Sequence, residues 1–297
     1  MNTMKKILIN IMAVLMLVVC CFGMSACQED ITQIKLNLSV YNYDDNEEGV
    51  DIGFENTTLT VDLYGHFAPK TVAAVLKYVK DGYYNNTVFY KIDSSFPNQI
   101  MLGDLKADGA GIKAQESIMP QISGEFEHGG VSGSNLTAKK GSIGLWRTWY
   151  EYDGSYNKSN ATMHSGRATW FMPTNELETT LSGYNGWFCI FAQMDMENEA
   201  NVKAFELIKD SLTSSNIEKY VVYYTGEYDA EQPDNNHGLT QHIVPADDFN
   251  VAEVADLFIP KGTQEVCYKH YTVNIPVVEI NGQTQIAARV VSAAVAK

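Results

Sequence analysis

Apolar residues between positions 59 and 80 change their spacing once, from that of a strand to that of a helix. Leu59, Val61 and Leu63 alternate with polar residues, as in a strand that buries one face. Pro69 suits the first turn of a helix, where the N–H that proline lacks would have no helical partner. The apolar residues that follow it at helical spacing are Val72, Val75, Leu76 and Val79. The pattern predicts a strand followed by an amphipathic helix.

A second strand is predicted directly after this helix. Gly82 suits the left-handed conformation that often follows a helix, and alternation returns from Val88 to Ile92. Within this strand, Lys91 lies on the face opposite its apolar neighbours, and Phe96 and Gln99 follow it. A cation close to an aromatic ring and an amide indicates a groove rather than a plain core strand.

Regular spacing also appears in other parts of the chain. The predicted strands are Lys35–Val40, Tyr220–Tyr224, Tyr271–Ile280 and Gln285–Val291. An amphipathic helix is predicted from Glu199 to Leu212, because its apolar residues recur every three to four positions. Between residues 103 and 144 the chain is rich in glycine, which predicts mostly loops.

The N-terminus has the features of an export signal. Lys5 and Lys6 precede an apolar run from Ile7 to Phe22, which is short for a transmembrane helix of about 20 residues. Cys27 directly follows Ser-Ala, and this resembles the bacterial lipoprotein signal. The resemblance implies cleavage before Cys27, lipidation of its thiol, and an extracytoplasmic protein anchored to a bacterial membrane. An uncleaved membrane anchor and ordinary secretion are the alternatives.

The chain is acidic, with a formal net charge of −15 at pH 7, and loss of the two lysines in residues 1–26 changes this charge to −17. Nucleic acid and anionic membrane surfaces attract basic proteins, so neither is expected as a partner. Beyond Cys27 the chain contains Cys189 and Cys267, both within strand-like runs. They are either two small buried side chains or a disulfide, which an oxidising compartment would permit.

No cofactor or metal is expected from the motifs of the chain. There is no C-x-x-C pair, and His237 and His242 are the closest histidines, without a third ligand nearby in the sequence. Residues 109–114 fit the glycine pattern of a dinucleotide site, yet no strand is predicted before them and no helix after them. The chain also lacks the G-x-S-x-G motif of hydrolases.

Two motifs around the predicted helix resemble those of the cyclophilin family of peptidyl-prolyl isomerases. A-P-K-T-V occupies residues 68–72 and G-Y-Y-x-x-T occupies residues 82–87, at the spacing that the family has. Gly103-Asp104, the segment 124–126 and L-S-G at 181–183 continue the resemblance. It covers roughly Thr58 to Leu212 plus a closing strand, which we assign to Tyr271–Ile280.

The resemblance implies a mostly β fold with a few helices, namely a closed eight-stranded antiparallel β-barrel capped by two helices. The domain boundaries that we expect follow from it. Residues 1–26 are the lipoprotein signal peptide, and residues 27–57 are an N-terminal tether and leading strand. Residues 58–297 form the cyclophilin-like domain, with loop insertions at about 147–167 and 214–269.

Rotating an Xaa-Pro bond against a barrier of ~18–20 kcal/mol requires no nucleophile. A donor aimed at the prolyl nitrogen, a dry pocket for the ring and groups that hold the flanking carbonyls lower this barrier. The resemblance places Lys91 where the family has its catalytic Arg, and Tyr90 where it has His. Thr169 stands for the substrate-binding Gln, and Phe171 keeps the aromatic residue of the proline pocket.

The remaining predicted site residues complete an apolar slot. The resemblance places Phe96 and Leu181 in it with Phe171, and Gln99 or Met101 at its edge. Each residue also has an ordinary structural interpretation: Lys91 as a solvated strand lysine, the phenylalanines as core aromatics, and Thr169 as a β-branched strand residue.

The resemblance implies an envelope-anchored prolyl isomerase that acts as a monomer on proline-containing polypeptides. Weakened activity is expected, because a lysine lacks the planar fork of the guanidinium that it replaces. The alternative is a non-catalytic cyclophilin-like module that binds proline-containing segments, another protein or a glycan. In that case, the aromatic stretches Trp146–Tyr156 and Tyr184–Trp187 would contact the partner.

Overall fold

The computed structural model describes twelve stretches of the chain. They are residues 31–43, 53–92, 99–117, 119–131, 136–147, 151–152, 155–156, 166–174, 182–214, 216–225, 240–250 and 271–296. The predicted signal peptide and Cys27 lie outside them. Within the described stretches, no helix is both long and apolar enough to cross a membrane.

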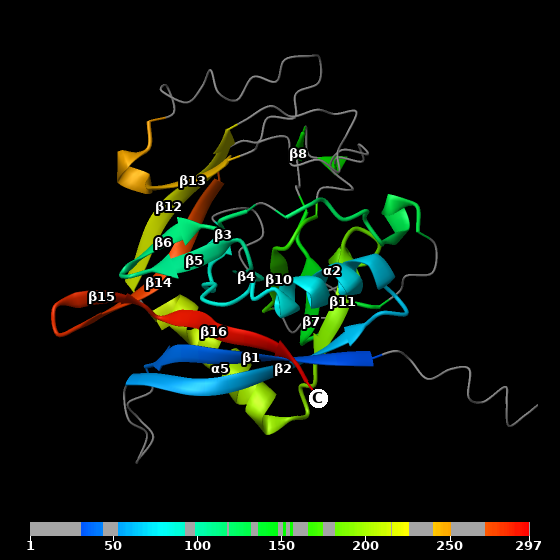
Figure 1. Cartoon of the computed structure of the whole chain (residues 1–297), viewed down its shortest axis with the longest axis horizontal. Helices are drawn as coiled ribbons and strands as arrows, with labels where there is room; N and C mark the ends of the chain where they lie inside the picture. The colour runs from blue at the N-terminus through cyan, green and yellow to red at the C-terminus, as the bar shows by residue number, and fades with distance from the viewer. Residues whose placement is uncertain are drawn as a thin grey trace, which may run out of the picture. The chain divides into compact units, whose positions relative to one another are not determined.

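A seven-stranded antiparallel sheet forms the main part of the domain (Figure 1). Its strand order is β16-β1-β2-β11-β7-β10-β4. The bounds of these strands are β1 (Ile31–Asn42), β2 (Gly53–Tyr64), β4 (Gln99–Leu102), β7 (Ser142–Leu145), β10 (Trp170–Pro173), β11 (Cys189–Met194) and β16 (Ala288–Val295). The strands predicted at Lys35–Val40 and from Leu59 lie within β1 and β2, and β1 pairs with β2 along its whole length.

The segment from Thr87 to Tyr90 joins the two edges of this sheet. On one side, Tyr90 and Met101 of β4 exchange backbone hydrogen bonds of 3.1 and 2.8 Å. On the other side, the N–H of Val290 in β16 donates to the carbonyl of Thr87 at 2.8 Å. Both bridges are antiparallel. Because the segment is bonded to both edges, it is the eighth strand of a barrel, and the predicted mostly β, eight-stranded antiparallel fold is confirmed.

Two α-helices occur in the described residues, α2 (Pro69–Lys80) and α5 (Glu199–Ser214). Helix α2 begins at the predicted Pro69, and its N-cap residue Ala68 makes no side-chain capping bond. Glu125 supplies the cap instead, since its carboxylate accepts the N–H groups of Lys70 and Thr71 at 3.0 and 2.8 Å. This carboxylate satisfies donors that a helix start otherwise leaves unpaired.

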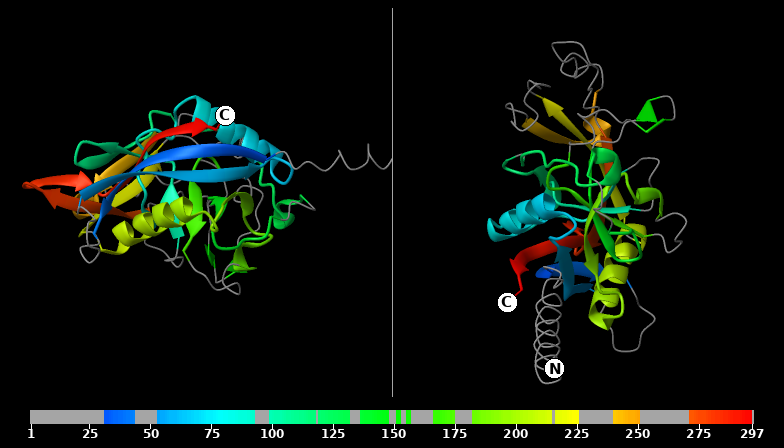
Figure 2. Two further views of the ribbon diagram at one scale, coloured as in Figure 1. Left: turned by 90° about the horizontal axis from the view of Figure 1, so that it is seen from below. Right: turned by 90° about the vertical axis from the view of Figure 1, so that its right-hand side faces the viewer.

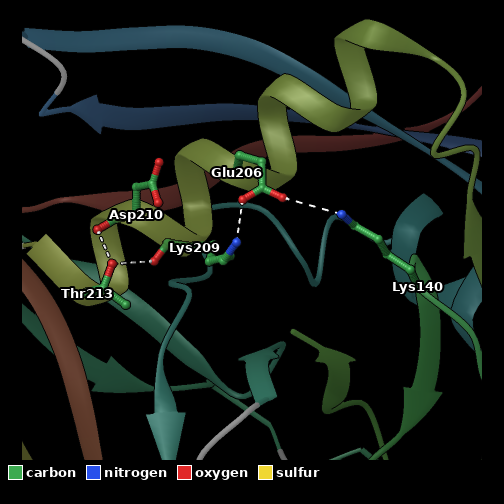
Figure 3. A network of polar contacts seen from close by, with 5 residues as sticks. All are labelled: Lys140, Glu206, Lys209, Asp210 and Thr213. Carbon is green, nitrogen blue, oxygen red and sulfur yellow. Dashed lines mark hydrogen bonds and ion pairs between the residues drawn. The ribbon is translucent and has the colours of Figure 1, made fainter. Parts of the chain in front are cut away.

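Helix α5 packs against β1 and β2 (Figure 2). It confirms the amphipathic helix predicted from Glu199 to Leu212. A polar network lies on this helix (Figure 3), where Glu206 accepts from Lys209 Nζ at 2.6 Å and pairs with Lys140 Nζ at 3.9 Å. These side chains are about one third exposed, so each pair contributes only about 0–1 kcal/mol.

A second sheet is built largely from the predicted 214–269 insertion and the chain that follows it. Its strands are β12 (Asn216–Thr225), β13 (Thr240–Pro245), β14 (Tyr271–Ile280), β15 (Gln283–Ile286) and β3 (Lys91–Ile92). Their order is β13-β12-β14-β15, and β3 also pairs with β14. The strand predicted at Tyr220–Tyr224 lies within β12.

Short elements complete the described structure. They are the hairpin strands β5 (Leu105–Asp108) with β6 (Gly111–Ala114) and β8 (Glu151–Tyr152) with β9 (Ser155–Tyr156), and the 3₁₀ turns η2 (Glu127–Gly129), η3 (Ser182–Tyr184) and η4 (Ala246–Asp248). Strands β8 and β9 come from the predicted insertion at about 147–167.

The closing strand of the barrel differs from the prediction. We assigned it to Tyr271–Ile280, but that stretch is β14 of the second sheet, and β16 pairs with β1 instead. Both stretches are rich in β-branched and small apolar residues, so spacing alone does not choose between them. The Asn281-Gly282 turn distinguishes the two stretches. Both residues have positive φ, as in a tight two-residue hairpin, and the turn pairs β14 with β15 rather than with β1.

Two apolar clusters lie on opposite faces of the barrel strands. In β10, Trp170 and Met172 belong to the cluster that also contains the buried faces of α2 and α5, whereas Phe171 belongs to the other cluster. Similarly, Phe89 belongs to the first cluster and Tyr90 to the second. Residues of the second sheet join the second cluster, namely Val222, Val273, Ile275, Val277 and Ile286. The second sheet therefore covers one outer side of the barrel.

Candidate active site

Four of the predicted site residues lie on one face of two adjacent strands. Met101 of β4 is the register partner of Phe171 in β10. Gln99 lies two residues before Met101, and Thr169 two residues before Phe171, so each pair points to the same side of its strand. The structure thus brings Gln99, Met101, Thr169 and Phe171 together on the outer face of the barrel, and this face is the candidate site.

Three aromatic side chains cover Phe171, and we call them the aromatic cap: Trp146, Tyr184 and Phe188. Their ring centroids lie 6.1, 5.3 and 5.0 Å from that of Phe171. Trp146 also stacks on Phe188, with the rings 5.9 Å apart and 21° from parallel. Phe171 has no exposed surface, and Met101 is 1 % exposed. The apolar slot is therefore filled by the protein's own rings.

The amide at the edge of the slot is bound to this cap. Gln99 Nε2 donates to the hydroxyl oxygen of Tyr184 at 2.9 Å, and both residues are buried. Burial raises the pKa of Tyr184, while the hydrogen bond from Gln99 acts in the opposite direction. The Gln99 amide is therefore directed at Tyr184 rather than at an open groove.

Lys91 lies beside β4, since its neighbour Tyr90 bridges Met101, but its side chain does not share the face of these four residues. It belongs to β3 and pairs with Asn274 of β14, and its neighbours Tyr90 and Ile92 both pack into the second cluster. Its side chain therefore points to the opposite side of the strand, as the sequence predicts. Burial lowers the pKa of the Lys91 ammonium group, which is half-buried. Its catalytic role stays a prediction.

Phe96 and Leu181, the other two residues predicted for the slot, lie outside the described residues. Thr169 is described and half-buried, and its carbonyl accepts the N–H of Trp146 at 2.8 Å. This bond fixes the backbone of Trp146 next to β10.

A buried carboxylate beside the site was not foreseen. Asp104 accepts hydrogen bonds from the hydroxyl of Tyr90 and, at 3.1 Å, from the hydroxyl of Tyr271. Burial raises the pKa of Asp104, and the two tyrosine hydrogen bonds lower it in part. The sequence pointed to one of these two tyrosines, because Tyr90 stands where the family has a histidine. It gave no signal for Tyr271, which comes from the second sheet.

Arg147 fixes the chain next to the cap. Its Nε donates to the carbonyl of Trp187 at 2.8 Å, and its guanidinium carbon lies 5.2 Å from the ring centroids of both Phe126 and Phe188. Burial lowers the pKa of Arg147 to about 10. The guanidinium is still a cation at neutral pH, and it holds the loop after η3 against the end of β7.

Cys189 is a buried free thiol, as the first of the two interpretations predicts, and Cys267 lies outside the described residues. The Cys189 sulfur lies 3.4 Å from the hydroxyl of Thr71. Burial raises the pKa of this thiol to about 12, so it is not a nucleophile at neutral pH. Among the described residues, no group of three or more His, Cys, Asp or Glu side chains could hold a metal ion.

An eight-stranded antiparallel barrel that carries an aromatic slot on its outer face defines a domain of the cyclophilin class. The family model described as cyclophilin type peptidyl-prolyl cis-trans isomerase/CLD matches residues 50–222, which is more than half of the chain. The chain therefore belongs to the cyclophilin-type peptidyl-prolyl isomerase family. No curated protein matches it.

Solved structures with a similar chain come from the same class. A cyclophilin-type isomerase of Cryptosporidium parvum is 16% identical over 72% of this chain and 99% of that chain, with a TM-score of 0.36. The same enzyme in the presence of the dipeptide Ala-Pro is 16% identical over 70% and 98% of the two chains, with a TM-score of 0.32. The cyclophilin AquaCyp293 of Hirschia baltica is 14% identical over 82% and 93%, with a TM-score of 0.29. At such values these similarities carry no argument about function.

Proposed function

We propose that this protein is a cyclophilin-type prolyl isomerase of the cell envelope, and that its turnover is strongly reduced. Membership of the family supports the activity. The burial of Phe171 beneath the aromatic cap is the observation that carries the reduced turnover. Proline-containing polypeptides are the substrates, and no cofactor takes part.

In the proposed mechanism, the long side chain of Lys91 reaches around its strand to the Phe171 face and donates a hydrogen bond to the prolyl nitrogen as the amide loses its resonance. Phe171, together with Phe96 and Leu181, receives the proline ring. Gln99 or Met101 borders the slot, and Thr169 holds a flanking carbonyl. A hydrogen bond from a charged donor is worth about 1.5–3 kcal/mol, and about 1.4 kcal/mol is a tenfold change in rate. A poorly aimed Lys91 therefore lowers the rate of isomerisation about tenfold to a hundredfold.

Exchange NMR on a blocked Ala-Pro peptide tests the activity. The full-length lipoprotein in detergent micelles is compared with Lys91→Ala and with Lys113→Ala. Lys113 is a matched control, because this exposed lysine of β6 pairs only loosely with Asp108, at 3.8 Å. We expect slow catalysis that Lys91→Ala lowers about tenfold to a hundredfold and Lys113→Ala leaves unchanged. Fast turnover that does not depend on Lys91 contradicts the proposal.

The envelope location rests on the N-terminal sequence. The charged start, the short apolar run and the Ser-Ala-Cys27 junction support cleavage and lipidation at Cys27. We expect mass spectrometry to find a diacylglyceryl group on Cys27. Cys27→Ser would move the protein from the membrane fraction to the soluble extracytoplasmic fraction. An unmodified Cys27 with the apolar run still attached contradicts this part of the proposal.

A non-catalytic cyclophilin-like binding module is the second candidate function. The hydrogen bond from Gln99 to Tyr184 favours it, because the amide at the slot edge is already bound inside the protein. In this case, a proline-containing peptide binds without faster exchange between its cis and trans forms. The NMR experiment separates the two functions, since binding shifts the peptide resonances whether or not exchange accelerates.

A further inference from the structure

Two parts of the protein cover the face that carries Phe171, and they differ in how readily they could move. The second sheet contributes Val222, Val273 and Ile275, none of which has exposed surface. Separating this sheet from the barrel would expose all of them to water, so the sheet is a fixed part of the domain. An opening of the slot must therefore come from the aromatic cap.

Within the cap, Trp146 differs from its two partners. Tyr184 and Phe188 are 6 % and 3 % exposed, whereas Trp146 is only half-buried. Tyr184 is also held by the hydrogen bond from Gln99. Trp146 is anchored through its backbone, whose N–H donates to Thr169, so the indole can turn about its side-chain torsions while the strand stays in place.

Trp146 directly follows β7, and this position places its indole next to the slot. Phe171 lies directly against this strand, because a Cβ added at Gly144 would come within 2.3 Å of two atoms of the Phe171 ring. Trp146 is two residues further along, on the same side of the chain, and its ring meets the Phe171 ring at 80°. Gly144 thus provides room for Phe171, and Trp146 limits access to it.

We propose that Trp146 is the gate of the proline slot: its indole must turn away before a proline ring can contact Phe171. This inference rests on the proposed function, since it concerns the same slot. An indole is larger than a proline ring, so replacing it by a small side chain leaves an apolar space that such a ring can fill. Apolar cavities of this kind bind small apolar groups.

Calorimetric titration of the full-length lipoprotein in micelles with a blocked Ala-Pro peptide tests the gate. We expect Trp146→Ala to bind the peptide at least tenfold more tightly than the wild type, and Trp146→Phe to stay within about threefold of it. Tyr41→Ala is the matched control, because Tyr41 is also half-buried but its ring packs against Tyr43 and Phe54, away from Phe171. It should leave the affinity unchanged.

Several results would overturn the gate. Equal affinity of Trp146→Ala and the wild type is one, and an equal gain in affinity in Tyr41→Ala is another. Trp146→Val serves as a second variant, and loss of the native fold in both variants also contradicts the proposal, since a gate must be dispensable for folding. The assay reads binding and not turnover. An inactive wild type whose Trp146→Ala variant gains affinity therefore rejects the proposed isomerase but keeps the gate.

Discussion

The hydroxyl of Tyr271 donates a hydrogen bond to Asp104 Oδ2 at 3.1 Å, between residues 167 positions apart in the sequence. Tyr271 begins β14 of the second sheet, and Asp104 lies in the short turn between β4 of the barrel and β5. Tyr90 donates to the other oxygen of the same carboxylate. The second sheet is thus attached to the barrel by apolar packing, by the pairing of β3 with β14 and by this partly buried hydrogen bond.

Tyr271→Phe removes this contact and leaves the ring in place. We expect a loss of about 1–3 kcal/mol in the free energy of unfolding, because a buried carboxylate oxygen loses its partner. Chemical denaturation followed by circular dichroism measures it. Tyr41→Phe is the control, since no hydrogen bond from the Tyr41 hydroxyl occurs among the described residues, and it should change stability by less than about 0.5 kcal/mol. Equal effects of the two variants contradict the expectation.

Asp104 also predicts a pH dependence of stability. Burial is the largest influence on its pKa and raises it above the ordinary 3.8, so the native state holds this proton at higher pH than the unfolded chain does. The contribution of Asp104 to the free energy of unfolding is therefore greatest at low pH, and it falls as the pH rises from about 4 through the raised pKa. Asp104→Asn should remove this slope. Denaturation midpoints at a series of pH values compare the two proteins, and parallel curves refute the assignment.

The start of α2 depends on a distant carboxylate. Glu125→Gln keeps the shape of the side chain but removes the charge that accepts the N–H groups of Lys70 and Thr71. We expect it to cost about 1–2 kcal/mol, as other helix caps do. Glu116→Gln is the matched control, because Glu116 is exposed. Hydrogen exchange of the first turn of α2 should accelerate in Glu125→Gln alone, and unchanged exchange would contradict the capping role.

The fold could be predicted from the sequence where local signals agree with the long-range pairing. Around Pro69, the strand, the helix start and the next strand all follow from spacing and from residues with strong positional preferences. Near the end of the chain, the prediction of the closing strand was wrong, because β14 and β16 have similar compositions. The Asn281-Gly282 turn was the deciding signal, and its positive φ angles make a hairpin with β15.

The site could be predicted only in part. The resemblance placed Gln99 or Met101 near Phe171, and the pairing of β4 with β10 in the structure puts Met101 opposite Phe171, with Gln99 on the same side of β4. The filling of the slot could not be predicted, because it depends on how Trp146, Tyr184 and Phe188 pack against Phe171. Those contacts join residues from separate strands and turns, and spacing along the chain does not contain them.

Lys91→Arg is the sharpest test of the catalytic assignment. An arginine restores the planar donor of the family, and one better-aimed hydrogen bond from a charged donor is worth about 1.4 kcal/mol, so kcat/KM should rise about tenfold. Lys113→Arg is the control and should leave kcat/KM unchanged.

The wild type and Lys91→Arg should also differ at alkaline pH. Burial lowers the pKa of Lys91 below its ordinary 10.5, so wild-type activity should fall as the pH rises through that lowered value, whereas the arginine variant stays charged and active. Exchange NMR from pH 7 to 10 measures both effects. Identical pH profiles would show that residue 91 does not act on the prolyl bond, whatever the change in rate at neutral pH.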